Sequence, residues 1–296
     1  MRILFCIPHY FCPSQNQFHG SEREAKQRLY AFEKCLAALN YNFRQNQQGL
    51  LQGSQRRVLS ANKELSHQLE VIVCTTGNYH LIEQLPANLC RHYETSAQPR
   101  LLGYECHQIL RDGLDQFDFF CYLEDDLLIN DALLFSKLKW FSNNAGNEAL
   151  LQPNRFELNI KPFPHKIYVD GDLVNLQLSQ QFQDRTHKPK LEATLMGEKY
   201  RFQRVDNPHS GCFFLNAAQM RKWVVTPYFL DRASDFWGPL ESAATLGIMK
   251  TFNVYKPSQE NAAFLEIEHL DPRYEIVIPS DQQHISTGLP LRRRRT

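Results

Sequence analysis

Three consecutive acidic residues follow an apolar segment near the middle of the sequence. Residues 117–123 read FDFFCYL, and Glu124, Asp125 and Asp126 come directly after them. Ligands of open α/β sheets bind at the carboxyl ends of the strands, so carboxylates placed there can take part in chemistry. Neighbouring anions repel one another, and a bound divalent cation relieves that repulsion; carboxylate oxygens suit Mg²⁺ or Mn²⁺. The triplet therefore predicts a metal site, with a solvated acidic turn as the alternative.

This segment resembles a motif of a known family. Residues 122–126, YLEDD, resemble the Asp-x-Asp region of GT-A-fold glycosyltransferases, in which acids at the end of a central strand hold a divalent cation against the diphosphate of a nucleotide-sugar donor. The resemblance implies that Asp126 is a direct metal ligand. It also implies that Glu124 contacts the nucleotide sugar and is a second ligand, and that Asp125 serves either the donor ribose or the ion. A glutamate at the first position departs from the commonest form of the motif.

Two other segments fit the same resemblance on the donor and acceptor sides. Pro8 and Tyr10 follow the opening strand, where such enzymes begin their nucleotide pocket, and Tyr10 is expected to stack on the base. Residues 235–241, DFWGPLE, resemble a loop and helix start that supply acceptor contacts and the general base. Glu241 is the expected base because a helix N-terminus stabilises a carboxylate, and an ordinary favourable first-turn charge is its alternative.

Within that second segment, Asp235 is the second choice for the base, and Trp237 and Gly238 are expected to contact the acceptor. His209 and Ser210, in a turn before an apolar segment, are expected to meet an acceptor sugar or donor hydroxyls, and an ordinary turn is the alternative.

A histidine near the end of the sequence completes the resemblance. His269 stands about where GT-A enzymes often carry a metal-binding histidine, so it is the implied third ligand. The alternative is a structural histidine held by hydrogen bonds.

Apolar patterning predicts the elements that position these residues. Buried strands are expected where apolar residues run without interruption, and helices where they recur every three or four residues after a capping residue. The interval 45–57 is rich in glutamine and is interpreted as an exposed loop or helical excursion. We expect strands at 3–7, 69–74, 117–123, 166–169 and 211–215, and helices from a capping box at 21–24 through 39, at 104–114, from a cap at Asp131 through 141, and at 239–248.

Composition bounds the class of protein. The chain has 296 residues, 43% of them hydrophobic, which excludes a wholly disordered chain. Its formal charge of +1 excludes a globally basic nucleic-acid binder, and no apolar run reaches the roughly 18 residues of a membrane span. The eight cysteines include no Cys-x-x-Cys pair and several lie in apolar segments, so they are expected to be reduced in a cytoplasmic protein. The zinc-like spacing of Cys6, His9 and Cys12 is interpreted as coincidence, because Cys6 lies within an expected buried strand.

The expected fold class is α/β: one GT-A-like domain over 1–296, with a mostly parallel central sheet flanked by helices. Residues 1–150 would form the nucleotide-sugar half, 151–285 a less regular acceptor half, and 286–296 a basic flexible tail. The four arginines at 292–295 offer peripheral contact with an anionic membrane, and a solvated tail is the alternative.

These observations together predict a glycosyltransferase that uses Mn²⁺ or Mg²⁺. It would move a sugar from a nucleotide diphosphate to a glycan, a lipid-linked or another hydroxyl acceptor, and no nucleic-acid partner is expected. One alternative is a non-catalytic glycan- or partner-binding protein on a degenerate transferase fold. Another is a GT-B-type glycosyltransferase, for whose two domains 296 residues leave little room, and a third is a metal-dependent phosphodiesterase or nuclease.

Overall fold

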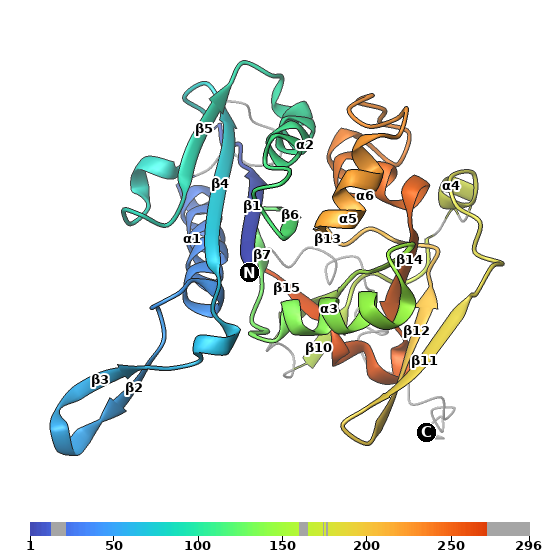
Figure 1. The fold of residues 1–296 in the computed structure, drawn as a ribbon. Coiled ribbons are helices and arrows are strands. Elements are labelled where there is room, and N and C mark those ends of the chain that lie inside the picture. Colours follow the sequence, from blue (N-terminus) through green and yellow to red (C-terminus); the bar gives the residue numbers. More distant parts are fainter. Residues whose placement is uncertain (13–21, 160–164, 174, 176, 271–296) are drawn as a thin grey trace, which may run out of the picture.

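A five-stranded sheet forms the centre of the fold (Figure 1). The computed structural model describes residues 1–12, 22–159, 165–173, 175 and 177–270. The strand order is β13-β6-β1-β4-β5, and all neighbours run parallel except β13, which is antiparallel to β6. The strands are β1 (Arg2–Pro8), β4 (Gln68–Thr76), β5 (Arg91–Thr95), β6 (Phe119–Leu123) and β13 (Cys212–Asn216).

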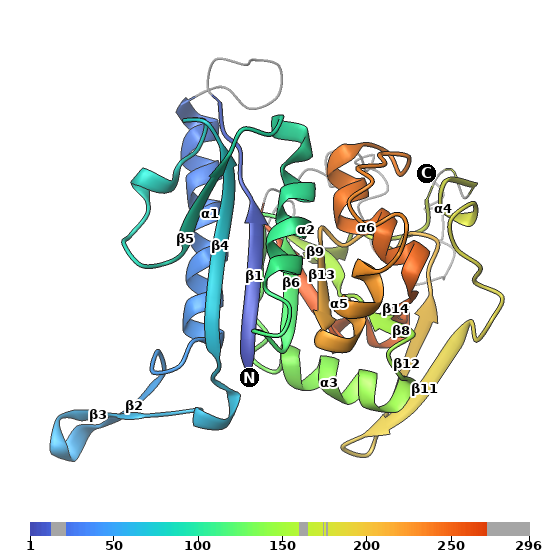
Figure 2. The same ribbon diagram turned by 45° about the horizontal axis from the view of Figure 1, so that its top comes forward.

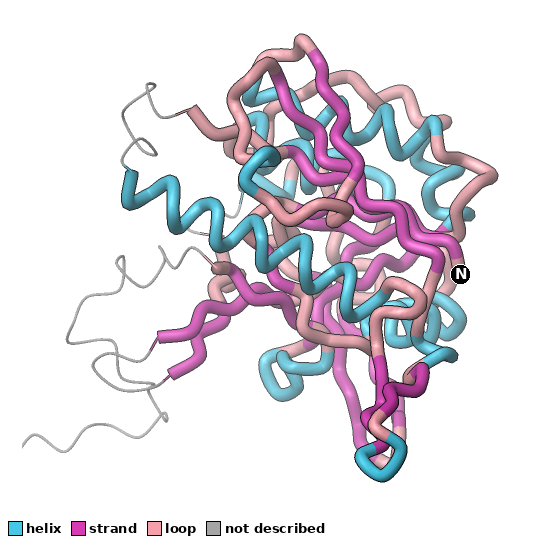
Figure 3. Tube along the Cα trace, turned by 90° about the vertical axis from the view of Figure 1, so that its left-hand side faces the viewer, coloured by secondary structure: helices cyan, strands magenta, loops and turns pink. Residues whose placement is uncertain are grey.

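Helices cover both faces of this sheet, which is why its central strands are apolar throughout. In β1, Ile3, Phe5 and Ile7 pack into one core with α1 and α3, whereas Leu4 and Cys6 pack into a second core with α2, α5 and α6. Figure 3 shows α1 as the long helix lying across the outside of the sheet, and Figure 2 shows α2 between β1 and α6. The helices are α1 (Glu22–Phe43), α2 (Leu102–Asp112), α3 (Leu134–Ala145), α5 (Ala217–Val224) and α6 (Pro239–Thr251).

Two smaller sheets extend the second half of the chain. One has the order β10-β9-β15-β7 and the other β11-β12-β14-β8. Their strands are β7 (Leu127–Leu128), β8 (Ala149–Leu151), β9 (Asn154–Asn159), β10 (His165–Tyr168), β11 (Lys190–Leu195), β12 (Glu198–Arg204), β14 (Asn253–Pro257) and β15 (Glu266–His269). The short helices are α4 (Gln177–Gln180), η1 (Gly53–Gln55), η2 (Lys63–Leu65), η3 (Ile82–Gln84), η4 (Pro99–Leu101) and η5 (Gln259–Phe264).

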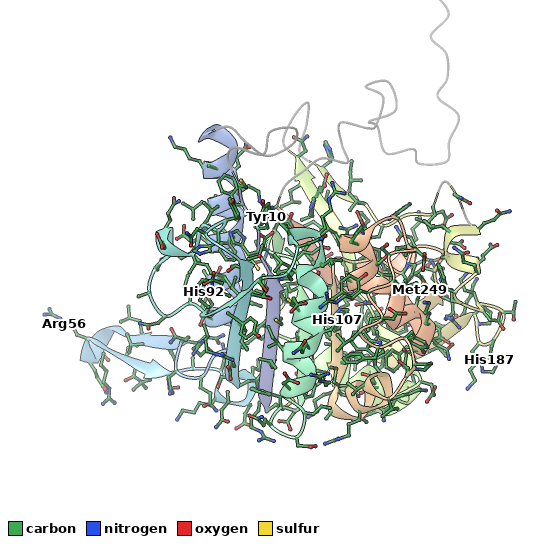
Figure 4. All side chains as sticks on the ribbon, turned by 90° about the horizontal axis from the view of Figure 1, so that it is seen from above. Tyr10, Arg56, His92, His107, His187 and Met249 are labelled. Carbon is green, nitrogen blue, oxygen red and sulfur yellow. The ribbon has the colours of Figure 1, made fainter. Side chains whose placement is uncertain are left out.

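The glutamine-rich interval forms a β-hairpin, so the expectation of a loop or helical excursion was wrong. Its strands β2 (Gly49–Gln52) and β3 (Arg57–Ser60) pair in antiparallel register. Leu51 lies opposite Val58 in this pairing, and both side chains remain largely exposed. The hairpin projects from the body of the protein, and Figure 4 places Arg56 at its outer end, far from Tyr10.

The α/β fold class and the mostly parallel central sheet are confirmed. The predicted cap at Asp131 is only partly right: α3 begins after Leu133, and the Asp131 carboxylate instead accepts from the Leu133 amide at 2.9 Å and from Lys137 Nζ at 2.7 Å. Ser21 of the expected capping box and the tail 286–296 with its arginines lie outside the described residues.

Cysteines and long helices add two observations. All eight cysteines carry free thiols, as expected, and seven of them are buried. Among the helices that the structure describes, none is both long and apolar enough to cross a membrane.

Candidate active site

The backbone on both sides of the acidic triplet is tied to other strands. The Glu124 amide donates to the carbonyl of Gly211 at 2.9 Å, just before β13, and the carbonyl of Asp126 accepts from the Leu270 amide at 2.9 Å, just after β15. These bonds hold the carboxyl end of β6 between the start of one strand and the end of another. The three carboxylates therefore have fixed directions, and each meets a different environment.

Asp125 is neutralised by the protein itself. Arg28 Nη2, from α1, donates to both carboxylate oxygens at 2.7 Å, and His9 Nδ1 lies 2.5 Å from Oδ2. Burial alone would raise the pKa of Asp125, but the positive Arg28 and the bond from His9 lower this pKa to about 2. Asp125 is thus an internal anion that joins α1 to β1 and β6.

Two hydrogen bonds and one ring contact fix the orientation of His9. Its Nε2 accepts from the Leu81 amide at 3.1 Å, so Nδ1 carries the hydrogen that His9 donates to Asp125. The ring stacks on Phe32 of α1, with 3.9 Å between centroids and 8° between planes. His9 is only 1% exposed, so its placement favours a structural role.

Asp126 shares Arg28 with Asp125 but is incompletely paired. Its Oδ2 lies 3.3 Å from Arg28 Nη1 and 3.7 Å from His269 Nε2. Its Oδ1 is buried and has no hydrogen-bond partner among the described residues. A buried carboxylate oxygen without a partner is costly, so this atom marks a position at which a cation or a donor group would be stabilised.

Glu124 carries the second unbalanced carboxyl group. Burial, and then repulsion by Asp126, raise the pKa of Glu124 to about 8, and Glu241 adds to the repulsion. The side chain also lies against Gly211, where a Cβ atom would be only 2.5 Å from Glu124 Oε2. The absence of a side chain at Gly211 is therefore what leaves room for Glu124.

His269 approaches the triplet from β15. Its Nδ1 lies 2.8 Å from Glu157 Oε1 of the adjacent strand β9, and its Nε2 faces Asp126. Burial alone would lower the pKa of His269, but the bond to Glu157 and the charge of Asp126 raise it. The histidine thus lies between two carboxylates.

A buried ion cluster lies beside these groups. Asp170 accepts from Arg155 Nε at 2.9 Å and from Lys256 Nζ at 2.8 Å, and all three side chains are at most 4% exposed. Burial would raise the pKa of Asp170, but Arg155 and then Lys256 lower it to about 2. Lys256 Nζ also donates to the carbonyl of His209 at 2.6 Å, which anchors the loop that leads to Gly211.

The predicted acceptor loop stands at the start of α6. Gly238 is the N-cap residue, and a Cβ atom at Gly238 would lie 3.2 Å from Glu241 Oε2, so the carboxylate of Glu241 is close to the helix N-terminus. Trp237 is 55% exposed and has a left-handed backbone with φ of 61°. Asp235 is exposed. Of the two base candidates, Glu241 is the one whose charge acts on Glu124.

His209 and Ser210 are buried and hydrogen-bonded inside the protein. His209 Nδ1 lies 2.8 Å from Thr245 Oγ1, and Ser210 Oγ donates to the carbonyl of Pro153 at 2.9 Å. Neither side chain reaches the surface, so the acceptor role predicted for them has no support from their placement. They instead fix the turn before β13.

Pro8 and Tyr10 lie at the carboxyl end of β1, on either side of His9. Pro8 is the last residue of the strand. The Tyr10 ring lies 5.7 Å from the ring of Tyr79, which is 47% exposed, and Figure 4 shows Tyr10 at this edge. Tyr10 therefore stands beside a second aromatic residue that sequence reasoning missed.

Sequence reasoning also missed Arg28, Glu157, Arg155, Asp170 and Lys256. One signal was available for β9, whose sequence NRFELN places Arg155 and Glu157 two residues apart and hence on one face of a strand. Both are buried. Two charged residues on the inward face of a strand indicate an internal charge network.

Within the described ranges, no group of three or more His, Cys, Asp and Glu side chains is arranged as a metal-binding cluster. The predicted ligands Asp126 and His269 nevertheless adjoin, and the Asp126 Oδ1 atom is buried without a hydrogen-bond partner among the described residues. The chemistry of these donors fits a divalent cation that completes its coordination with phosphate oxygens and water.

Comparisons with known proteins give a distant likeness. No family model and no curated protein matches the chain. One similar solved structure is the mannose-1-phosphate geranyltransferase from Thermus thermophilus, at 12% identity and a TM-score of 0.38, covering 86% of this chain and 73% of that one. Another is mouse xyloside xylosyltransferase 1 in its apo form, at 14% identity and a TM-score of 0.37, covering 86% and 84%. Both are transferases by name.

Proposed function

We propose that this protein is a divalent-metal-dependent glycosyltransferase that moves a sugar from a nucleotide diphosphate to a hydroxyl acceptor. The observation that carries the proposal is the unpartnered, buried Oδ1 atom of Asp126 beside His269 and Glu124. Asp125 already has its cation in Arg28, whereas the other two acids have no cation bound as closely among the described residues. A metal ion bound with a diphosphate would supply it.

The geometry of the two nearest donors agrees with a shared ion. Two ligand atoms that are each about 2.1 Å from one ion lie between about 3.0 and 4.2 Å apart. The distance from His269 Nε2 to Asp126 Oδ2 is 3.7 Å. Mg²⁺ and Mn²⁺ sites of this kind use one or two protein carboxylates and take further oxygens from substrate phosphates. Asp126, His269 and Glu124 would therefore hold the ion.

When bound, the cation would stabilise the negative charge that grows on the leaving diphosphate. Glu241, in the first turn of α6, would take the proton of the acceptor hydroxyl as its oxygen attacks the anomeric carbon. Exposed Asp235 is the second candidate for the base.

Residues at the start of α6 and at the end of β1 would position the two substrates. Trp237 and Gly238 would contact the acceptor, because the exposed Trp237 ring offers a flat apolar face just before the start of α6. Pro8 and Tyr10, at the end of β1, would lie against the donor nucleotide.

A direct experiment tests this function. Purified protein with Mn²⁺ and a panel of nucleotide sugars should hydrolyse or transfer from at least one donor, and Asp126→Ala should lower that rate by about 100-fold or more. Asp131→Ala is the control, because it removes a nearby carboxylate that pairs with Lys137 and with the start of α3. Full activity in Asp126→Ala would overturn the metal assignment. Donor binding without any turnover would instead favour a non-catalytic binding protein.

A further inference from the structure

The strand that carries His269 is inserted between two others. β15 pairs in parallel with β9, with Glu268 opposite Phe156, and antiparallel with β7, with His269 opposite Leu127. This register sets Glu157 of β9 beside His269 on one side and the acidic triplet, which directly precedes β7, on the other. The imidazole is therefore fixed between two carboxylates by the sheet itself.

The two ring nitrogens meet their carboxylates at different distances. Nδ1 lies 2.8 Å from Glu157 Oε1, within hydrogen-bond range, whereas Nε2 lies 3.7 Å from Asp126 Oδ2. N–H···O bonds are about 2.7–3.2 Å long, so the second contact is too long for one. An ionised carboxylate only accepts, so the hydrogen of the closer pair is on Nδ1.

We propose that Glu157 is a positioning residue, which holds His269 as the Nδ1–H tautomer so that the Nε2 lone pair faces the metal position beside Asp126. This inference rests on the proposed function, since it assigns a role at the same site. A carboxylate that accepts from the second nitrogen of a ligating histidine fixes both its tautomer and its ring orientation. Glu157 is 3% exposed and the histidine 9%, so solvent does not compete for this bond.

A purely structural ion pair is the competing explanation. In that case the imidazole would simply fill the space between two anions, and the short bond would contribute to stability alone. The unequal distances favour the positioning role, because one carboxylate is in bonding contact while the other keeps the separation expected of two ligands of one ion. The two explanations differ in metal affinity and in the tautomer of the ring.

Metal binding is the first test. Mn²⁺ titrations followed by electron paramagnetic resonance need no donor, acceptor or turnover. Glu157→Leu should weaken Mn²⁺ binding by about 10- to 100-fold, and Glu157→Gln, whose amide oxygen can still accept from Nδ1, should retain most of the affinity. Glu266→Leu is the matched control: it removes a carboxylate of β15 that pairs with Lys166 and Tyr168 instead of His269, and it should leave the affinity within about twofold.

The tautomer is the second test, and it uses the wild-type protein. Nitrogen-15 NMR of histidine-labelled protein, with the His269 signal assigned by its loss in His269→Gln, should show a protonated Nδ1 and an unprotonated Nε2 once the ring is neutral. A proton on Nε2 would overturn the inference even if Glu157→Leu did not fold.

The outcomes separate the inference from the function on which it rests. A folded Glu157→Leu variant that binds Mn²⁺ as tightly as the wild type overturns the positioning role and leaves the proposed transferase intact. A wild-type protein that binds no Mn²⁺ overturns the metal assignment, and the positioning role with it.

Discussion

The imidazole of His9 and the carboxylate of Asp125 lie 2.5 Å apart, at the adjoining ends of the parallel strands β1 and β6. This contact distinguishes Asp125 from the other two acids of the triplet. Asp125 is bound to His9 and Arg28, whereas Glu124 and Asp126 have no bound cation of comparable closeness within the described part of the chain. Three neighbouring acids thus meet different surroundings, because their side chains leave the strand end in different directions.

Alanine substitutions should separate these roles. Asp125→Ala removes the carboxylate that pairs with buried His9 and with the partly buried Arg28, so the free energy of unfolding should fall by about 2–3 kcal/mol. Asp126→Ala removes an acid whose Oδ1 atom has no partner among the residues described, so stability should change by less than about 1 kcal/mol. Urea denaturation of both variants measures this difference. Equal losses would mean that the two acids share one structural role.

Space at Gly211 should be needed for Glu124. Gly211→Ala introduces a Cβ atom 2.5 Å from Glu124 Oε2 at a residue with φ of 61°, so it should displace the carboxyl group and weaken Mn²⁺ binding. Gly197→Ala is the control for backbone strain, because Gly197 has φ of 85° but no described neighbouring atom within 4 Å. Both should lose about 1 kcal/mol of stability through the backbone, and only Gly211→Ala should lose metal affinity. Equal Mn²⁺ affinities, measured by titration, would contradict this account.

Glu241 should be required for turnover. If it accepts the proton of the acceptor, Glu241→Gln should lower kcat by about 100-fold or more while donor binding is kept. Glu260→Gln is the control, since Glu260 is an exposed acid in the first turn of another helix, η5. Steady-state kinetics with the donor identified in the panel measure both variants. A loss confined to KM would instead indicate a binding role.

His107 should make the protein less stable in mild acid. Burial lowers the pKa of His107 to about 4, from 6.5 in an unfolded chain, and its Nε2 bonds to the carbonyl of Ala243. Between these pH values the unfolded chain binds more protons, so the free energy of unfolding falls as the pH drops from 6.5 to 4, by about 3 kcal/mol. Urea denaturation at pH 7 and pH 4 should show a smaller decrease for His107→Gln, whereas the exposed His187→Gln should match the wild type (Figure 4). Identical decreases in all three proteins would exclude the histidine as the cause.

The central sheet could be predicted because its strands are buried on both faces. The apolar segments at β1, β4 and β6 have few polar residues, so their positions in the sequence are evident. Of the strands in the smaller sheets, β10 was expected from the segment 166–169, whereas the others were not recognised in this way. β9 and β12 carry charged residues inside, Arg155 and Arg204, which are buried because distant residues such as Asp170 and Asn253 bond to them. Pairing over such separations leaves no local pattern.

The site was predictable only in part, for the same reason. The triplet was identified from its position after a strand. The closer pairing of Asp125 than of Asp126 depends on Arg28, which lies in a helix about a hundred residues earlier. His269 was identified from a family resemblance, whereas Glu157 is recognisable only once β9 and β15 are adjacent. His209 and Ser210 were expected to contact a substrate because they are polar residues of a turn. Their side chains are instead buried and hydrogen-bonded inside the protein.

The place of β15 between β9 and β7 has a consequence for biosynthesis. The two strands that flank β15 leave the ribosome long before β15 itself, so this sheet cannot be completed while the intervening chain is still being made. His269 can therefore come between Glu157 and Asp126 only late in synthesis. A nascent chain can form its parallel strands early and still lack the bond between Glu157 and His269 until synthesis has passed this histidine.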